Sequence, residues 1–241
     1  MVHCTVLKYV GRGITRGIHD GSAGFSAEVF RSHLQFMAEH RFKTVSLNQV
    51  AKAFTGGARL PERAVVITFE GESSFSDGIG NLLLAQQMPA TVFVDPRSDD
   101  PDGLHSRMRQ MGELGLSIGH QIVIERFTPE QLPVPIEQQV REAKSELEQL
   151  LGEPVQHATY AFDVFLGTER KILGRLGYST ASTVATAMAG LHLDPFSIRQ
   201  SLITEQDDIG RFGWKLWRSG AKPGFVKGGS GANRSAQIAG A

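Results

Sequence analysis

Short apolar runs rich in β-branched residues alternate with longer amphipathic segments along this chain. The clearest runs cover residues 5–10, 64–69 and 90–94, and weaker ones follow at 156–160 and 178–183. A nearly continuous apolar run of this length is typical of a parallel strand, because helices cover both faces of a parallel sheet. The runs therefore predict a set of buried parallel strands.

The segments between these runs carry the signals of helix ends. Ser26 precedes one amphipathic segment, and Ser46 with Gln49 has the spacing of a capping box before another. A longer amphipathic segment covers residues 136–150, and Gly152 follows it as a residue suited to ending a helix. The alternation of strands and helices predicts an α/β fold, either a (β/α) barrel or a doubly wound sheet.

The length of the chain suits one large domain. The chain has 241 residues, and we place the domain at residues 1–227. Residues 228–241 are mostly Gly, Ser and Ala with almost no large apolar side chain. Such a segment buries too little surface to offset the entropy lost on ordering, so we expect a flexible tail.

Charge and hydropathy narrow the range of partners. The 25 basic residues balance the 25 acidic ones, so no net charge attracts the protein to nucleic acid or to an anionic membrane. No apolar run approaches the length of a membrane span, and residues 1–10 lack the pattern of a secretory signal. We therefore expect a cytoplasmic protein with no membrane span and no nucleic-acid partner.

Several common catalytic motifs are not matched. Gly11, Gly13 and Gly17 follow the first strand, but their spacing fits neither a dinucleotide loop nor a Walker loop. The sequence contains no Gly-x-Ser-x-Gly elbow and no His-Glu-x-x-His zinc motif. His33 and His40 fall on or beside the polar side of the first helix, so we expect both to be solvated.

Other segments are specific enough to resemble a family. Residues 60–72 read LPERAVVITFEGE, and after a predicted helix residues 88–94 read MPATVFV. They are similar to the lP..aVvlTFDDG and pATfFv motifs of NodB-type polysaccharide deacetylases, the family-four carbohydrate esterases. Residues 6–10, VLKYV, resemble that family's vlmYH strand, and residues 114–119, LGLSIG, resemble its lh.lG.eIGsH motif. The resemblance extends over most of the chain.

This resemblance implies a distorted (β/α) barrel with the active groove at the carboxyl ends of the strands. It also implies metal-dependent removal of N- or O-acetyl groups from polysaccharides. In that chemistry an Asp-His-His set binds a divalent metal, usually zinc, which polarises the carbonyl group and activates water. The first Asp of the TFDDG motif is the general base, and the second is a metal ligand.

The chain departs from the family's pattern where the chemistry is carried. Glu70 stands at the position of the base, and Gly71 stands at the position of the Asp ligand. Gln121 and Glu125 stand where the two histidine ligands are expected. We therefore expect no metal cofactor. The candidate groove residues besides Glu70 are Glu72, His120, Gln121, Glu125 and Tyr160.

Three hypotheses follow. The first is a non-catalytic deacetylase-like protein, a pseudoenzyme that acts in carbohydrate or exopolysaccharide metabolism by binding a glycan or a polysaccharide-synthesis protein. The alternative is an active deacetylase with an altered site, in which Glu70, Glu72 and Glu125 hold a hard cation or form an acid–base pair. The third is a purely structural subunit whose groove is filled by side chains such as Val10 and Phe162.

Overall fold

The structure is a computed structural model that describes residues 4–11, 25–71, 75–97, 101–123, 135–160, 169–183 and 194–218. Within these ranges strands and helices alternate along most of the chain, as the sequence predicts. The strands are β1 (Thr5–Tyr9), β2 (Lys43–Thr44), β3 (Ala64–Glu70), β4 (Ala90–Val94), β5 (Ser117–Ile122), β6 (His157–Tyr160), β7 (Thr180–Thr183) and β8 (Ile198–Ile203). The helices are α1 (Ala27–Glu39), α2 (Leu47–Phe54), α3 (Asp77–Ala85), α4 (Pro101–Glu113), α5 (Ile136–Leu151), α6 (Glu169–Arg175) and α7 (Ile209–Arg218).

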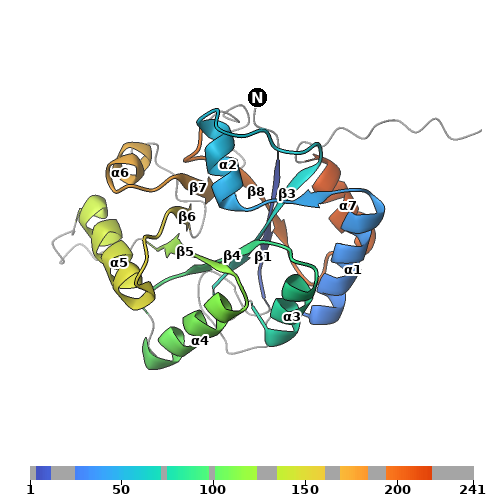
Figure 1. The fold of residues 1–241 in the computed structure, drawn as a ribbon, viewed down its shortest axis with the longest axis horizontal. Helices are drawn as coiled ribbons and strands as arrows, with labels where there is room; N and C mark the ends of the chain where they lie inside the picture. Colours follow the sequence, from blue (N-terminus) through green and yellow to red (C-terminus); the bar gives the residue numbers. More distant parts are fainter. Residues whose placement is uncertain are drawn as a thin grey trace, which may run out of the picture.

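The strands form one parallel sheet that closes on itself. Their order is β1-β8-β7-β6-β5-β4-β3-β2, and β1 also pairs with β3, with Thr5 opposite Val65 and Tyr9 opposite Phe69. All strands except the short β2 therefore make a barrel. Figure 1 shows helices such as α1, α3, α4 and α5 lying around the strands. Of the two folds that the alternation predicts, the (β/α) barrel is confirmed.

The helix ends predicted from the sequence are confirmed. Ser26 caps α1, its side chain accepting a hydrogen bond from the Val29 N–H. Ser46 and Gln49 form the capping box of α2. The Ser46 N–H donates to Gln49 Oε1 at 2.8 Å, and the Gln49 N–H donates to Ser46 Oγ at 3.2 Å. Gly152 ends α5 with a φ of 71°, a conformation that costs glycine little.

Side chains alternate between two apolar clusters because successive residues of a strand point to opposite faces. Leu7 and Tyr9 of β1 belong to the larger cluster, which lies between the strands and the surrounding helices. Val6 of the same strand belongs to a smaller cluster in the lumen, the interior of the barrel, together with Phe93. Leu47 and Val50 of α2 pack into this second cluster. The lumen is therefore filled and covered near the amino-terminal ends of the strands.

His33 of α1 is buried, so the prediction that it is solvated was wrong. Its exposed fraction is 1%, and its ring stacks on Phe212 of α7 with the ring centroids 3.8 Å apart. Tyr9 Oη lies 3.4 Å from its Nδ1 atom. The buried arc of α1 is wider than a single stripe, because α1 packs against α7 as well as the barrel. Burial lowers the pKa of His33 to about 4.

The predictions about a membrane span, the tail and the domain boundary can be compared with the structure only within the described ranges. No helix within those ranges is both long enough and apolar enough to cross a membrane. The tail expected at residues 228–241 lies outside the described residues, and so does the boundary of the predicted domain at residue 227.

Candidate functional site

The carboxyl ends of the barrel strands bring three of the singled-out positions together. Glu70 is the last residue of β3, Gly71 follows it, and Gln121 is the fifth of the six residues of β5. In (β/α) barrels the catalytic residues lie at this end, because the βα loops that follow the strands converge there. We call the region around Lys8, Glu70 and Gln121 the barrel mouth.

A buried ion pair occupies the barrel mouth. Lys8 Nζ lies 2.7 Å from Glu70 Oε2, and the exposed fractions of the two residues are 1% and 8%. Lys8 stands opposite Thr68 in the β1–β3 register, two residues before Glu70. The long lysine side chain therefore runs along the lumen toward the carboxyl ends of the strands, and its ammonium group reaches the carboxylate.

Below the mouth, polar side chains connect strands that are not neighbours in the sheet. Gln200 Nε2 on β8 donates to Thr68 Oγ1 on β3 at 3.3 Å. Thr159 Oγ1 on β6 donates to Gln200 Oε1 at 3.2 Å. Since β1 separates β8 from β3 and β7 separates β6 from β8, these bonds cross the lumen. Any ligand of the mouth must therefore sit above this layer.

Gly71 contributes backbone only. Its N–H donates to the Phe93 carbonyl oxygen at 2.8 Å, and its φ is 73°. This left-handed conformation costs an ordinary L-residue about 1–2 kcal/mol. A carboxylate ligand at residue 71 would therefore need a different backbone conformation or would carry strain.

Gln121 is placed in the barrel mouth by the alternation of β5. Ile118 and Ile122 belong to the outer cluster, so Gly119 and Gln121 point the other way, into the lumen. Gln121 is 8% exposed. Its amide is a neutral oxygen or nitrogen donor, whereas zinc in proteins is bound mainly by thiolate, imidazole and carboxylate groups.

His120 lies on the outer face of β5, which is not the groove position expected from the sequence. Its Nδ1 atom is 2.5 Å from Tyr178 Oη, and Lys144 of α5 lies over the Tyr178 ring. Burial lowers the pKa of His120 to about 3, and the positive charges of Arg97 and Lys144 add to the effect. His120 is therefore a neutral residue of the layer between the barrel and α5.

Tyr160 is also placed outside the lumen. It stands opposite Ile122 in the β5–β6 register and belongs to the outer apolar cluster with an exposed fraction of 2%. The groove position expected for Tyr160 is therefore not where the structure places it. Glu72, Glu125 and Phe162 lie outside the described residues, whereas Val10 is described and buried.

The described residues of the mouth do not fit a zinc centre. A catalytic zinc site needs three protein ligands, and within the described ranges no group of three or more His, Cys, Asp or Glu side chains could hold a metal ion. Gly71 offers no side chain at the position of the Asp ligand. The Lys8 ammonium group would repel a cation bound close to Glu70.

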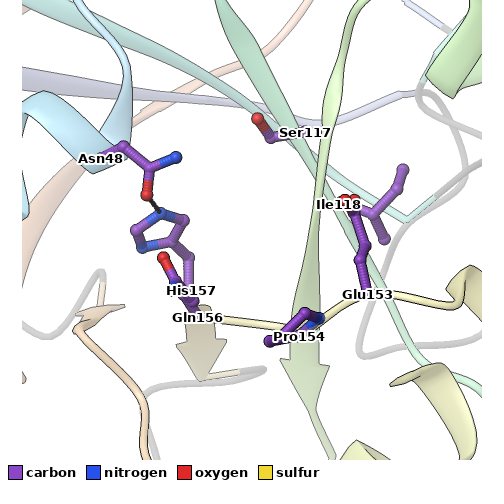
Figure 2. A pocket seen from close by; sticks show the side chains of 7 residues that line it. All are labelled: Asn48, Ser117, Ile118, Glu153, Pro154, Gln156 and His157. Atoms are coloured by element: carbon purple, nitrogen blue, oxygen red, sulfur yellow. Dashed lines mark hydrogen bonds between the residues drawn. The ribbon is translucent and has the colours of Figure 1, made fainter.

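A cavity of about 290 Å³ opens at the opposite end of the barrel. Figure 2 shows its lining residues, which are Asn48, Ser117, Ile118, Glu153, Pro154, Gln156 and His157. Ser117 and His157 are the first residues of β5 and β6, so the cavity lies at the amino-terminal ends of the strands. In (β/α) barrels this end contributes to stability rather than catalysis.

His157 connects this end of the barrel to α2. Its Nε2–H donates to Asn48 Oδ1 at 2.9 Å, and its Nδ1 accepts from Thr180 Oγ1 at 2.9 Å (Figure 2 shows the first bond). Burial lowers the pKa of His157 to about 4, so the ring is neutral, and a neutral ring that donates from Nε2 accepts at Nδ1. The residue thus fixes α2 over the lumen.

Removing the Asn48 side chain tests this anchor. Asn48→Ala leaves the buried His157 Nε2–H without its acceptor, so we expect a loss of about 1–2 kcal/mol in the free energy of unfolding. Urea unfolding at pH 7 measures it. Lys52→Ala, at an exposed position one turn further along the same helix, is the control and should change stability by less than about 0.5 kcal/mol. Equal stability of the two variants would show that the anchor contributes nothing.

Sequence reasoning missed Lys8 as a site residue. The signal was present, because Lys8 is the one charged residue in the apolar run 5–10. Lysine is almost never fully buried unless it is paired, so a lysine within a buried strand points to a carboxylate partner. Which carboxylate it meets depends on the closure of the barrel between β1 and β3.

Comparison with solved structures gives three close matches in fold. The deacetylase PplD of Streptococcus pyogenes, in complex with acetate, has a TM-score of 0.68 at 18% identity, over 89% of this chain and 98% of that one. IcaB from Ammonifex degensii has a TM-score of 0.67 at 16% identity, over 90% of this chain and 98% of that one. A de-N-acetylase from Aggregatibacter actinomycetemcomitans has a TM-score of 0.67 at 15% identity, over 88% of this chain and 99% of that one.

These matches span nearly the whole length of each solved chain, and they show that this protein has the fold of the NodB-type polysaccharide deacetylases. At 15–18% identity the likeness is one of fold. No family model and no curated protein matches the sequence.

Proposed function

We propose that this protein is a non-catalytic member of the deacetylase fold that acts in carbohydrate or exopolysaccharide metabolism by binding a glycan or a partner protein. The observation that carries the proposal is the Lys8–Glu70 ion pair beside Gly71. Glu70, at the position of the base, is paired with the buried Lys8 ammonium group, and Gly71, at the position of the Asp ligand, has no side chain.

The chemistry of the fold family explains why these replacements matter. A divalent metal lowers the barrier to amide or ester hydrolysis by several kcal/mol, because it polarises the carbonyl group and activates water. Gly71 and Gln121 supply neither of the charged or imidazole ligands that such a metal needs. A general base must also accept a proton from water, and the Lys8 ammonium group at Glu70 Oε2 competes with water for this carboxylate.

The fold supports carbohydrate metabolism as the setting. Solved proteins with this fold are described as a deacetylase in complex with acetate and as a de-N-acetylase. A barrel that keeps this shape over about nine-tenths of its length keeps the framework of a polysaccharide groove. The bonds that cross the lumen below the mouth favour binding of a ligand or partner at the surface of the mouth over a deep substrate pocket.

An acetate-release assay tests the absence of catalysis. We expect the wild-type protein to release no acetate from chitooligosaccharides or acetylated xylan above the buffer rate, with or without added zinc. Glu70→Ala should behave identically, because Glu70 is not acting as a base. Metal analysis of the purified protein should find less than stoichiometric zinc.

The alternative of an altered, carboxylate-rich active site predicts a different result. Acetate release by the wild-type protein that disappears in Glu70→Ala would establish an enzyme in which Glu70 acts with Glu72 and Glu125. Titration of the same glycans into the wild-type protein by calorimetry then separates glycan binding from a role confined to a protein partner.

A further inference from the structure

Among the described residues of the barrel mouth, Lys8 and Glu70 bring one positive and one negative charge together. Lys8 and Glu70 are both buried, and burying an ion costs several kcal/mol unless a close opposite charge compensates. Their separation of 2.7 Å is that of a charge-assisted hydrogen bond. One ammonium group and one carboxylate therefore form a neutral unit.

The lysine reaches this position because of its length and its place in the register. Lys8 Cα stands opposite Thr68, one lumen-facing position below Glu70. A side chain shorter than lysine would end beside the polar layer of Thr68 and Gln200. The four-carbon stem instead carries the positive charge up to the Glu70 carboxylate at the carboxyl end of β3.

The residues at positions 8, 71 and 121 each make the mouth less attractive to a metal cation. At residue 71 a negative ligand is absent, at residue 121 a neutral amide stands in the lumen, and at residue 8 a positive charge is present. Of the described side chains at this place, a divalent ion would gain the Glu70 carboxylate alone, and the buried ammonium group would repel it. The described part of the mouth therefore lacks the further negative ligands that would attract a metal ion, and the Lys8 ammonium group supplies the positive charge there.

We propose that the Lys8 ammonium group is the resident cation of the barrel mouth, with Glu70 as its fixed counter-ion, and that Lys8 excludes a divalent metal from this place. The inference rests on the proposed function, because it explains how the site remains stable without the metal that the fold family uses. It makes Lys8 a positioning residue that holds Glu70, rather than a group that touches a substrate.

A pair of variants that differ only at residue 8 tests the exclusion of metal. Gly71→Asp with Gln121→His supplies two ligand types, and the same pair of changes with Lys8→Met removes the internal cation. We expect zinc to raise the melting temperature of the triple variant by about 5 °C or more, because a ligand that binds only the folded state stabilises it. Zinc should leave the double variant unchanged. An equal response of the two, or no response of the triple variant, would overturn the proposal.

A double-mutant cycle tests the counter-ion role. Lys8→Met and Glu70→Gln should each lower the folding equilibrium constant by about 100-fold or more, since each removes the opposite charge 2.7 Å from a buried ion. The variant with both changes should recover at least about ten-fold of the summed loss. Arg141→Met with Glu137→Gln, an exposed pair on α5, is the matched control and should couple by less than about five-fold.

If Lys8→Met alone does not fold, the double-mutant cycle still tests the counter-ion role, because the variant with both changes is expected to fold. A double variant no more stable than the weaker single one would overturn the counter-ion role. The acetate assay distinguishes a failure of the proposed function from a failure of the inference about Lys8. Acetate release by the wild-type protein contradicts the proposed function whatever the cycle gives, whereas additive single changes without acetate release contradict only the inference about Lys8.

Discussion

Acidification from pH 7 to about pH 4.5 is expected to unfold this protein. Three buried histidines have pKa values far below the ordinary value of 6.5, at about 4 for His33, about 3 for His120 and about 4 for His157. In each case burial is the main cause, because an apolar environment disfavours the charged imidazolium.

The direction of the effect follows from which state binds the protons. Above pH 6.5 these histidines are neutral in both states, so their contribution to stability is complete. Between pH 6.5 and about 4 the unfolded chain binds protons that the folded chain does not, so the free energy of unfolding falls as the pH falls. At pH 5 each histidine loses about 2 kcal/mol, and the sum of about 6 kcal/mol approaches the total stability of an ordinary domain.

Urea unfolding at pH 7.0 and pH 5.0, followed by far-ultraviolet circular dichroism, measures this loss. His157→Gln keeps a polar side chain near Asn48 and removes one titrating group, so it should reduce the pH dependence by about one third. A wild-type stability that is equal at the two pH values would refute the assignment of neutral buried histidines.

The elements of the fold could be predicted from the sequence where local physics decides them. The capping box of Ser46 and Gln49 and the glycine stop at Gly152 involve residues at most a few positions apart, so the sequence alone reveals them. His33 could not be placed in the same way. Its burial depends on the contact with Phe212, which is 179 positions away in the chain.

The candidate site could be predicted in part for the same reason. Glu70 was found from its motif, and it lies at the carboxyl end of its strand as expected. His120 and Gln121 are adjacent in sequence, and the register of β5 decides which of them faces the lumen. Successive residues of a strand point to opposite faces, so a shift of one residue in the alignment moves a side chain to the other face. Motif similarity could therefore name both residues but could not decide which of them faces the lumen.

Truncation of Phe93 is expected to be among the most damaging single changes in the barrel. Phe93 is completely buried in the lumen cluster beside Val6 and Val66. Phe93→Ala should lower the free energy of unfolding by about 3–5 kcal/mol, because it removes buried apolar surface and leaves a cavity that the closed barrel cannot collapse. Phe54→Ala is the matched control, since Phe54 is only partly buried against the same cluster, and it should cost clearly less.

Gly119 shows how closely the Phe93 ring is held. A Cβ atom on Gly119 would lie 2.5 Å from two carbons of the Phe93 ring and 3.1 Å from the His157 carbonyl oxygen. Gly119→Ala should therefore cost about 1–3 kcal/mol through overpacking. Combined with Phe93→Ala, the new methyl group enters the space that the ring has left, so the two losses should add to less than their sum. Urea unfolding of the two single variants and the double variant measures this coupling, and strictly additive losses would show that the ring and the glycine are not in contact.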